Sequence, residues 1–434
     1  MRKSWLIRFL FCGLFLVQIF QSSALCAELN ISKNKFVIFN PPANTINEVM
    51  KTESISTQTI VANKWVGTWA TSPYLVTESN IPPSPGLSNN TLRQIIRVSI
   101  GGNQIRLKFS NQYGKSPVTM NSVHLAVSDG KSSIKSDTDK VLTFGGNESV
   151  TIPAGQTITS DTLNYGLEKL ANMAITIYFG SIPTDLTGHP GSRTTSYLQS
   201  DNAVTESSLP TAVTTDHWYF ITGMDVLTSG KAVVALGDSI TDGRGATTNA
   251  NNRWTDIFAS CLQKNPATSN VAVLNQGIGG NSVLSGGLGP VAVERFDRDV
   301  LEQSGVRYLI IFEGINDIGS EKSTLKLSTD LINSYKNFIS KAHDKNILVY
   351  GATILPCGGS GYYSELHEQI RQTVNDWIRT SRQFDAVIDF DAALRDSNTA
   401  TRLLSTYDSG DHLHPNPEGY NKMAEAIDLN LFSK

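Results

Sequence analysis

The segment KAVVALGDSITDGRG, residues 231–245, opens with a Val-rich apolar run that breaks at Gly237. A run of this length, bounded by glycine and followed by a helix-like pattern, is typical of a strand buried on both faces of a parallel sheet. Asp238 and Ser239 stand directly after the break. They therefore lie at the carboxyl end of the predicted strand, where open α/β sheets place ligands and chemistry. A lone Gly-Asp-Ser is more often an ordinary turn, so this interpretation depends on the segments downstream.

Strand-like and helix-like segments alternate from residue 231 to residue 434. Further strands are predicted at 271–274, 308–312, 347–354 and 386–390, and helices at 254–263, 291–301, 325–342, 366–378 and 417–431. Five strands interleaved with helices require right-handed crossovers between parallel strands. We therefore expect an α/β fold over residues 231–434, a doubly wound parallel sheet with the strand order 2-1-3-4-5.

The preceding residues, 65–226, have a different sequence pattern. They contain short runs of β-type residues separated by turns that are rich in glycine and proline. The runs lie at 92–100, 104–109, 118–127, 149–152 and 173–179. This pattern predicts an accessory domain that is an antiparallel β sandwich without a catalytic cluster of its own. Its candidate ligand contacts are His189, Trp65, Trp69 and Trp218, although aromatic side chains in such a domain more often belong to the core.

Composition and charge limit the classes of partner. The 434 residues allow about two domains, and 40% hydrophobic with 17% charged residues is ordinary for a globular core. The 36 Lys and Arg residues nearly balance 39 Asp and Glu residues, for a formal charge of -3. This balance leaves no large basic surface for nucleic acid or an anionic membrane. Small neutral substrates fit the composition better.

Residues 1–27 have the pattern of a secretory signal peptide. Three basic residues accompany an apolar stretch over 5–20, and a small-residue segment ends at Ala27. An uncleaved membrane anchor fits less well, because the apolar run is short and contains Gln18. We therefore expect cleavage near Ala27 and a secreted or periplasmic protein with no stable membrane insertion.

The polar segment 28–64 has no sustained period and indicates a linker or a loosely attached arm. After signal cleavage the chain keeps two cysteines, Cys261 and Cys357. Two are too few for a disulfide scaffold, and the sequence does not say whether they pair.

Three further polar segments come at the same edge of the predicted sheet as Ser239. Segment 275–281 follows the second strand, and its glycines let backbone N–H groups approach a ligand closely. Segment 313–317 follows the third strand and brings the Asn316 amide to this edge. Segment 411–417 precedes the last helix and ends in residues suited to a helix start.

Together these residues indicate an acyl-transfer site. Ser239 is a weak nucleophile unless an imidazole takes its proton, and His414 can take it while Asp411 orients the ring and stabilises the imidazolium. An Asp three residues before the His reaches the ring only if the loop bends. The N–H groups of Ser239 and Gly280 and the amide of Asn316 are the candidate oxyanion donors.

These segments resemble the conserved blocks of the SGNH (GDSL-type) hydrolases. The matching residues are Gly237-Asp238-Ser239-Ile240, Gly280, Gly314-Ile315-Asn316-Asp317, and Asp411 with His414. The resemblance runs from about residue 233 to the end of the chain, and it implies a flavodoxin-like fold and an esterase that uses no cofactor. The chain departs from the pattern at Ile240, where Leu is usual, and Gly277 or Gly279 is an alternative donor to Gly280. The start of the β domain, WVGTWATSP, resembles that of bacterial members described as arylesterases or carbohydrate esterases.

Other functions are left open. An α/β-hydrolase elbow is disfavoured because Thr241 stands where a second glycine is required. A metal-dependent hydrolase would take its ligands from Asp238, Asp242, Asp317, His412 and His414. A noncatalytic glycan-binding protein would use the β domain alone. Within the esterase class, a general arylesterase or a lysophospholipase-like acylhydrolase is the alternative.

The loops predicted to rim the site are small and polar, at 241–245, 281–282 and 357–363. A lipase acting on long chains is expected to have an exposed apolar lid or groove instead. Tyr362 or Tyr363 either stacks on a sugar or aryl ring or packs at the start of the next helix, and the sequence leaves both open. We therefore expect a serine esterase for short acyl esters, acetyl above all, with a carbohydrate or aryl alcohol.

Overall fold

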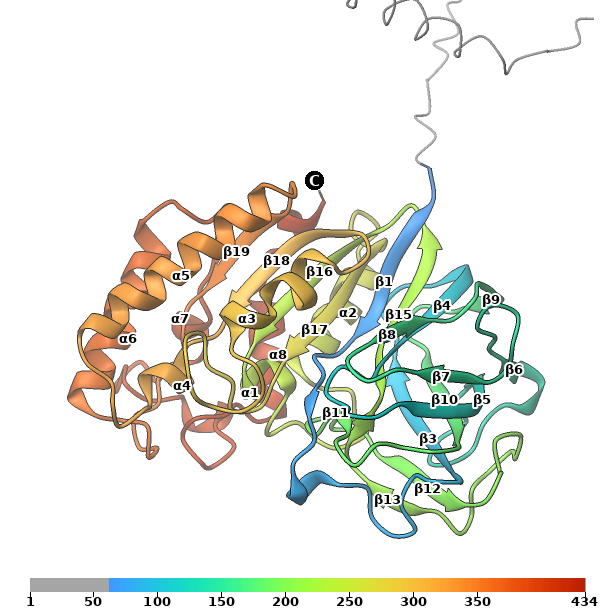
Figure 1. The fold of residues 1–434 in the computed structure, drawn as a ribbon. Coiled ribbons are helices and arrows are strands. Elements are labelled where there is room, and N and C mark those ends of the chain that lie inside the picture. The colour runs from blue at the N-terminus through green and yellow to red at the C-terminus, as the bar shows by residue number, and fades with distance from the viewer. Residues whose placement is uncertain (1–61, 434) are drawn as a thin grey trace, which may run out of the picture. The chain divides into compact units, whose positions relative to one another are not determined.

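The α/β part is built on a parallel sheet at the C-terminal side of the chain, in a computed structural model that describes residues 62–433 (Figure 1). Its strands are β16 (Lys231–Gly237), β17 (Val271–Gly277), β18 (Val306–Phe312), β19 (Leu348–Ala352) and β20 (Ala386–Ile388). They lie in the order β17-β16-β18-β19-β20, which confirms the predicted 2-1-3-4-5 order and the α/β fold class. The last residue of β16, Gly237, pairs with Gly277 and Phe312, so the carboxyl ends of three strands lie level.

Helices cover both faces of this sheet. They are α1 (Ser239–Asp242), α2 (Trp254–Lys264), α3 (Ala292–Phe296), α4 (Ile315–Ile318), α5 (Lys326–His343), α6 (Glu365–Thr380), α7 (Phe390–Leu394) and α8 (Pro417–Glu425). Alternate side chains of β16 divide between two cores: Val234 and Leu236 pack with residues of α3, α5 and α6, whereas Val233 and Ala235 pack with α2, α7 and α8. This two-sided burial explains why the strand is apolar from Ala232 to Leu236.

Two predicted helices differ from the structure. The helix expected over 291–301 is α3 followed by a π turn, Asp297–Leu301. The helix expected over 417–431 ends at Glu425, because Asp428 starts a separate 3-10 turn, Leu429–Phe432, by accepting a hydrogen bond from Asn430 N. The predicted signal peptide, and the linker up to residue 61, lie outside the described residues.

The β domain contains two main antiparallel sheets and a small third one. The first has β1 (Lys64–Ala70), β15 (Ile221–Thr228), β4 (Gly102–Ser110), β8 (Thr157–Thr159) and β9 (Leu163–Leu167). The second has β13 (Val213–Thr215), β12 (Ser196–Ser200), β3 (Asn90–Arg97), β10 (Asn172–Phe179), β5 (Val118–Val127), β6 (Lys140–Val141) and β7 (Val150–Ile152). The third has β14 (Trp218–Tyr219), β11 (Thr187–His189) and β2 (Tyr74–Leu75). Side chains from both main sheets share one hydrophobic cluster, as the predicted β sandwich requires.

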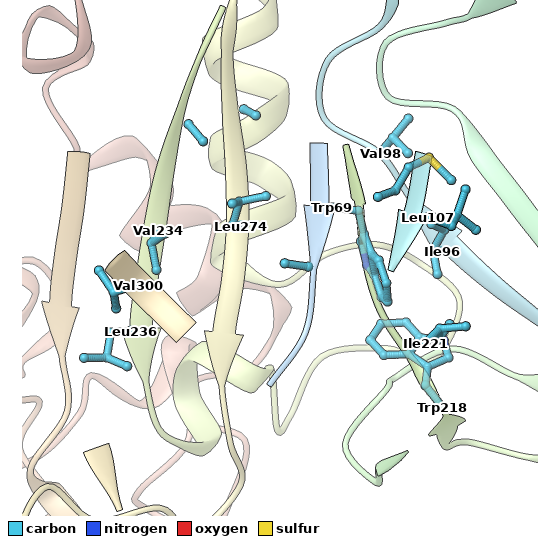
Figure 2. Packing of buried hydrophobic residues seen from close by; sticks show 14 of the residues in the cluster. Trp69, Ile96, Val98, Leu107, Trp218, Ile221, Val234, Leu236, Leu274 and Val300 are labelled. Atoms are coloured by element: carbon cyan, nitrogen blue, oxygen red, sulfur yellow. The ribbon is translucent and has the colours of Figure 1, made fainter. Parts of the chain in front are cut away.

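The β domain covers the edge strand of the parallel sheet. Strand β1 packs along β17, and Gly67 lets the two approach closely, since a Cβ there would lie 2.9 Å from Leu274 Cδ1. On the outer side of β17, Val273 N donates to Ser99 Oγ (3.1 Å), which satisfies a backbone group that an edge strand leaves unpaired. Figure 2 shows the continuous packing from Val234 and Leu274 to the β domain.

The aromatic residues of the β domain are mainly core residues. Trp69 and Trp218 are buried and meet edge to face, with ring centroids 5.0 Å apart. Trp65 is half-buried beneath the guanidinium of Arg106. The core interpretation is therefore confirmed for Trp69 and Trp218. Cys261 and Cys357 are both unpaired, and within residues 62–433 no helix has the length and apolar character that crossing a membrane requires.

Candidate active site

Ser239 occupies the first position of the one-turn helix α1, which begins where strand β16 ends. Only glycine fits at Gly237, because a Cβ there would lie 2.2 Å from Thr241 Oγ1. The Asp238 side chain caps the turn by accepting a hydrogen bond from Ile240 N (2.9 Å). This local geometry holds the Ser239 side chain at the carboxyl end of β16.

The side chains of Asp411, His414 and Ser239 form a continuous hydrogen-bonded row. Asp411 Oδ2 lies 2.7 Å from His414 Nδ1, and His414 Nε2 lies 2.8 Å from Ser239 Oγ. Asp411 Oδ1 also accepts hydrogen bonds from the backbone N–H groups of Leu413 and His414. The loop bends as the spacing of three residues requires, because His412 adopts a left-handed φ of 61°.

The surroundings of this row determine where its protons lie. Burial disfavours the charge of Asp411, but hydrogen bonds from the backbone and ring of His414 outweigh burial and lower the pKa of Asp411 to about 2. Burial lowers the pKa of His414 below its ordinary value, although Asp411 opposes this shift. An ionised Asp411 only accepts, so His414 carries its proton on Nδ1 and offers Nε2 to the Ser239 hydroxyl. His414 is therefore a neutral base at neutral pH.

The glycine segment supplies backbone donors to the same cleft. Gly279 and Gly280 line the cleft with Ser239, whereas the N–H of Gly277 donates to Asn275 Oδ1 (2.9 Å). Gly277 is therefore the least suited of the three alternative glycine donors. Gly280 has a φ of 71°, a conformation that favours glycine. Gly279 and Gly280 both remain candidates for the second oxyanion donor, and the assignment to Gly280 stays a prediction.

The Asn316 amide is held by two hydrogen bonds. Asn316 Nδ2 donates to Asn281 O (2.7 Å), and Asn316 Oδ1 accepts from the Tyr362 hydroxyl (3.0 Å). Together they fix the plane of the amide and leave its second N–H available to a ligand. Tyr362 thus has a role that the sequence interpretation missed, since neither ring stacking nor helix packing includes this contact. Tyr363 instead donates to Glu365 Oε1.

An open cleft of about 400 Å³ contains these groups. Both parts of the chain line it: Tyr74, Asn80, Pro190, Gly191 and Arg193 from the β domain, and Ser239, Asp242, Arg244, Gly279, Gly280, Leu288, Asn316, Tyr362, Leu413 and His414 from the α/β part.

The predicted polar rim is only partly correct. Asn281, Ser282 and Cys357 are buried rather than on the rim. Leu288 lines the cleft and is 55% exposed, so the cleft has an apolar wall that the sequence interpretation did not include.

A second histidine–aspartate pair lies beneath the cleft. His189 Nδ1 is 2.8 Å from Ser72 O, and His189 Nε2 is 2.8 Å from Asp242 Oδ1. The prediction that His189 contacts a ligand is wrong, because its side chain is only 3% exposed. Its ring is instead the hydrogen-bond partner of the buried Asp242 carboxylate. Gly191 allows this approach, since a Cβ there would lie 1.9 Å from Asp242 Oδ2.

The alternative metal ligands do not converge. Each of Asp238, Asp242, Asp317, His412 and His414 is engaged by a different protein group. Within residues 62–433, no group of three His, Cys, Asp or Glu side chains is placed to hold a metal ion. The donor set therefore does not favour the metal-dependent alternative.

The buried guanidinium of Arg295 joins the ends of the central strands. Its Nη2 donates to Gly237 O (3.0 Å), its Nη1 to Gln276 O (2.7 Å), and its Nε to Asn281 Oδ1 (3.0 Å). Arg295 Nη1 also donates to Ser72 Oγ of the β domain (3.1 Å). One side chain thus connects the nucleophile turn, the glycine segment and the β domain.

Acidic groups surround this guanidinium. Arg295 pairs with Asp299 (3.1 Å) and with Glu313 (3.3 Å). Burial raises the pKa of Glu313 to about 8, that of Asp238 to about 7, and that of Asp317 to about 6. Asp299 differs, because the charge and hydrogen bonds of Arg298 overcome its burial and lower its pKa. Asp299 is therefore the main counter-charge of Arg295 near neutral pH.

We expect Arg295→Met to lower the free energy of unfolding by about 3–5 kcal/mol, because Asp299 loses one of its two arginine partners and the buried acceptors Gly237 O and Gln276 O lose their Arg295 donor. Urea unfolding followed by tryptophan fluorescence measures this loss. The control is Arg382→Gln, an exposed arginine whose replacement should change stability by no more than about 0.5 kcal/mol. A loss in Arg295→Met no larger than that of the control would contradict the structural role of Arg295.

Comparison with known proteins gives a family for the α/β part. Residues 235–422 match the model of the GDSL-like Lipase/Acylhydrolase family. None of the curated proteins compared with the chain matches it.

Several solved structures are similar to less than half of this chain. A protein of the G-D-S-L lipolytic family from Desulfitobacterium hafniense is 25% identical, with 45% of this chain and 97% of that chain covered and a TM-score of 0.35. A GDSL-like lipase from Bacteroides thetaiotaomicron is 20% identical, with 45% and 85% covered and a TM-score of 0.35. A catalytic mutant of Axe2, an acetylxylan esterase from Geobacillus stearothermophilus, is 19% identical, with 45% and 92% covered and a TM-score of 0.36.

The nucleophile turn, the glycine segment and the Asp411–His414 loop all fall within the matched residues. The part of the chain that matches the GDSL-like Lipase/Acylhydrolase family is thus the part that carries the candidate active site.

Proposed function

We propose that the chain is a serine esterase that removes short acyl groups, acetyl above all, from a carbohydrate or aryl alcohol through an acyl-enzyme. The observation that supports this most directly is the hydrogen-bonded row from Asp411 through His414 to Ser239, which opens on a cleft with oxyanion donors. No cofactor is required, because Ser239 supplies the nucleophile and His414 moves the proton. The pattern of residues 1–27 supports a secreted or periplasmic site of action.

In the acylation half, Ser239 Oγ attacks the ester carbonyl carbon while His414 Nε2 takes the hydroxyl proton. The carbonyl oxygen becomes an oxyanion, which accepts hydrogen bonds from the N–H groups of Ser239 and Gly280 and from the Asn316 amide. Collapse of this intermediate breaks the bond to the alcohol oxygen, and the imidazolium of His414 protonates that oxygen. Asp411 stabilises the imidazolium during both proton transfers.

In the deacylation half, water attacks the acyl carbonyl and gives its proton to His414. Collapse of the second intermediate releases the carboxylic acid, and His414 returns the proton to Ser239 Oγ. The same oxyanion donors act in both halves because the carbonyl oxygen does not move between them.

The cleft walls favour a small acyl group. Leu288 packs against Gly280, where a Cβ would lie 3.2 Å from Leu288 Cγ. An acyl group whose carbonyl oxygen meets Gly280 would therefore lie near this one apolar side chain. Two residues with polar groups, Asn80 and Tyr74, are on the lining contributed by the β domain, which suits a polar alcohol.

The direct test is a series of p-nitrophenyl esters from acetate to palmitate, followed by acetate release from acetylated saccharides. We expect the highest kcat/KM for acetate and a steep fall beyond about six carbons, since the lining offers a longer chain little apolar surface besides Leu288 and Leu413. A maximum at long chains would contradict the short-acyl proposal. Turnover of aryl esters with no acetylated saccharide cleaved would indicate a general arylesterase.

Ser239→Ala and His414→Ala should each abolish most turnover, and the double variant should be barely slower than either one. Residues that act as one unit have non-additive effects of this kind. The measurement is kcat on p-nitrophenyl acetate for the three variants. Losses that multiply in the double variant would show that Ser239 and His414 act independently.

Asn316→Ala should lower kcat by roughly a hundredfold or more with little change in KM, because its amide meets charge present mainly in the transition state. Tyr362→Phe removes only the hydroxyl that orients the amide, so we expect a smaller fall, also in kcat. Thermal unfolding of both variants is the control. A loss of thermal stability with unchanged specific activity would assign Asn316 to structure instead.

A further inference from the structure

Two guanidinium groups on the cleft have no role in the mechanism above. Arg193 comes from the β domain and Arg244 from the loop that follows the nucleophile turn, and both line the cleft with Ser239 and His414. They come from two loops that hydrogen bonds join, since Asn249 N donates to Arg193 O (3.0 Å).

The backbones of both arginines are anchored near the nucleophile. Arg244 N donates to Ser239 O (2.8 Å), and the Tyr420 hydroxyl donates to Arg244 O. Arg193 adopts a φ of 50°, and the cleft-lining Gly191 two residues before it packs against Asp242. Both side chains therefore begin at positions that are fixed relative to Ser239.

Most of their hydrogen-bonding capacity is unused. Arg244 is exposed and its side chain makes no hydrogen bond or ion pair with any residue of 62–433. Arg193 Nη2 lies 3.7 Å from Asp242 Oδ2, and Arg193 Nε is buried without a hydrogen-bond partner. By contrast, Arg295 and Arg371 bond through several of their nitrogens.

One carboxylate on the cleft lining faces two cations. Asp242 is the only Asp or Glu in the lining of this cleft, as drawn from residues 62–433. Its Oδ1 accepts from His189 and its Oδ2 faces Arg193 at 3.7 Å, so it offsets part of the Arg193 charge and none of the Arg244 charge by direct contact. Asp411 is engaged by His414. Both arginines act electrostatically at the site. Burial is the main cause of the lowered pKa of His414, and the charges of Arg244 and Arg193 lower it further. A bound substrate therefore meets local positive charge, despite the formal net charge of -3.

We propose that Arg193 and Arg244 form an anion-binding subsite beside Ser239, and that the preferred ester carries a carboxylate. A guanidinium matches a carboxylate with two parallel N–H donors, which makes arginine well suited to this recognition. The inference rests on the proposed esterase function and narrows its substrate class. The carboxylate belongs either to the alcohol part, as in a uronic acid, or to the acyl part, as in a dicarboxylic acid half-ester.

Two matched pairs of substrates separate these sources. For the alcohol part, 4-acetoxybenzoate is compared with its methyl ester; for the acyl part, the 4-nitrophenyl half-ester of succinate is compared with 4-nitrophenyl butyrate. The quantity measured is the ratio of kcat/KM for the anionic member to that for the neutral member. We expect a ratio above one for one pair, and a fall of about tenfold in that ratio in Arg244→Gln, the scale of one charge-assisted hydrogen bond.

Matched variants assign the effect to this subsite. Arg193→Gln should lower the same ratio and Arg193→Lys should restore part of it. Arg382→Gln removes an exposed charge on the loop between α6 and β20, at the opposite edge of the sheet, and should leave the ratio unchanged. Because Arg244 is exposed, its variant keeps the test valid if Arg193→Gln does not fold. A ratio at or below one for both pairs, or one that Arg244→Gln leaves intact, would overturn the proposal.

A binding experiment separates this proposal from the esterase proposal. In Ser239→Ala, calorimetry should detect binding of at least one of the two anionic esters, 4-acetoxybenzoate or the 4-nitrophenyl half-ester of succinate, and this binding should weaken about tenfold when Arg244→Gln is added. Arg244-dependent binding together with no turnover of any ester by the native chain would support the subsite and overturn the esterase function. Turnover of neutral esters with no Arg244-dependent binding would support the esterase and overturn the subsite.

Discussion

The buried guanidinium of Arg295 is the constraint on which the site depends. Its donors must be satisfied, since an unpaired buried charge costs several kcal/mol. The acceptors that satisfy them are Gly237 O, Gln276 O, the Asn281 side chain and Ser72 Oγ. Satisfying one side chain therefore fixes where the nucleophile turn begins, where the glycine segment runs, and where the β domain docks.

The β domain is part of the cleft as well as a cover for the sheet. Its Ser99 hydroxyl accepts a hydrogen bond from the backbone N–H of Val273 in edge strand β17, and its side chains share a hydrophobic cluster with the parallel sheet. The same contact brings His189 onto Asp242, which lies three residues after Ser239, and puts Tyr74 on the cleft wall. Residues of both parts of the chain therefore line the cleft in which Ser239 lies. This arrangement gives the β domain a physical route to influence which alcohols are accepted.

Much of the fold followed from local pattern. The Val-rich run before Gly237 is apolar at every position, because helices bury both faces of the strand, and this made the parallel sheet and its order predictable. The candidate residues were predictable for a related reason: parallel strands end at one edge, so polar residues after consecutive strands gather there. Ser239 and His414 are 175 positions apart, yet their side chains lie 2.8 Å from each other.

By itself, the sequence determined the α/β class, the strand order and the residue types at the sheet edge, because periodicity and strand ends are local properties. Only the tertiary structure decided that Tyr362 holds Asn316, that His189 is buried against Asp242, and that Leu288 and Arg193 line the cleft. These contacts join loops from different elements, and loop positions depend on packing between the two parts of the chain. The hydrophobic periodicity of a sequence does not indicate which distant side chain will hydrogen-bond to a buried carboxylate or amide.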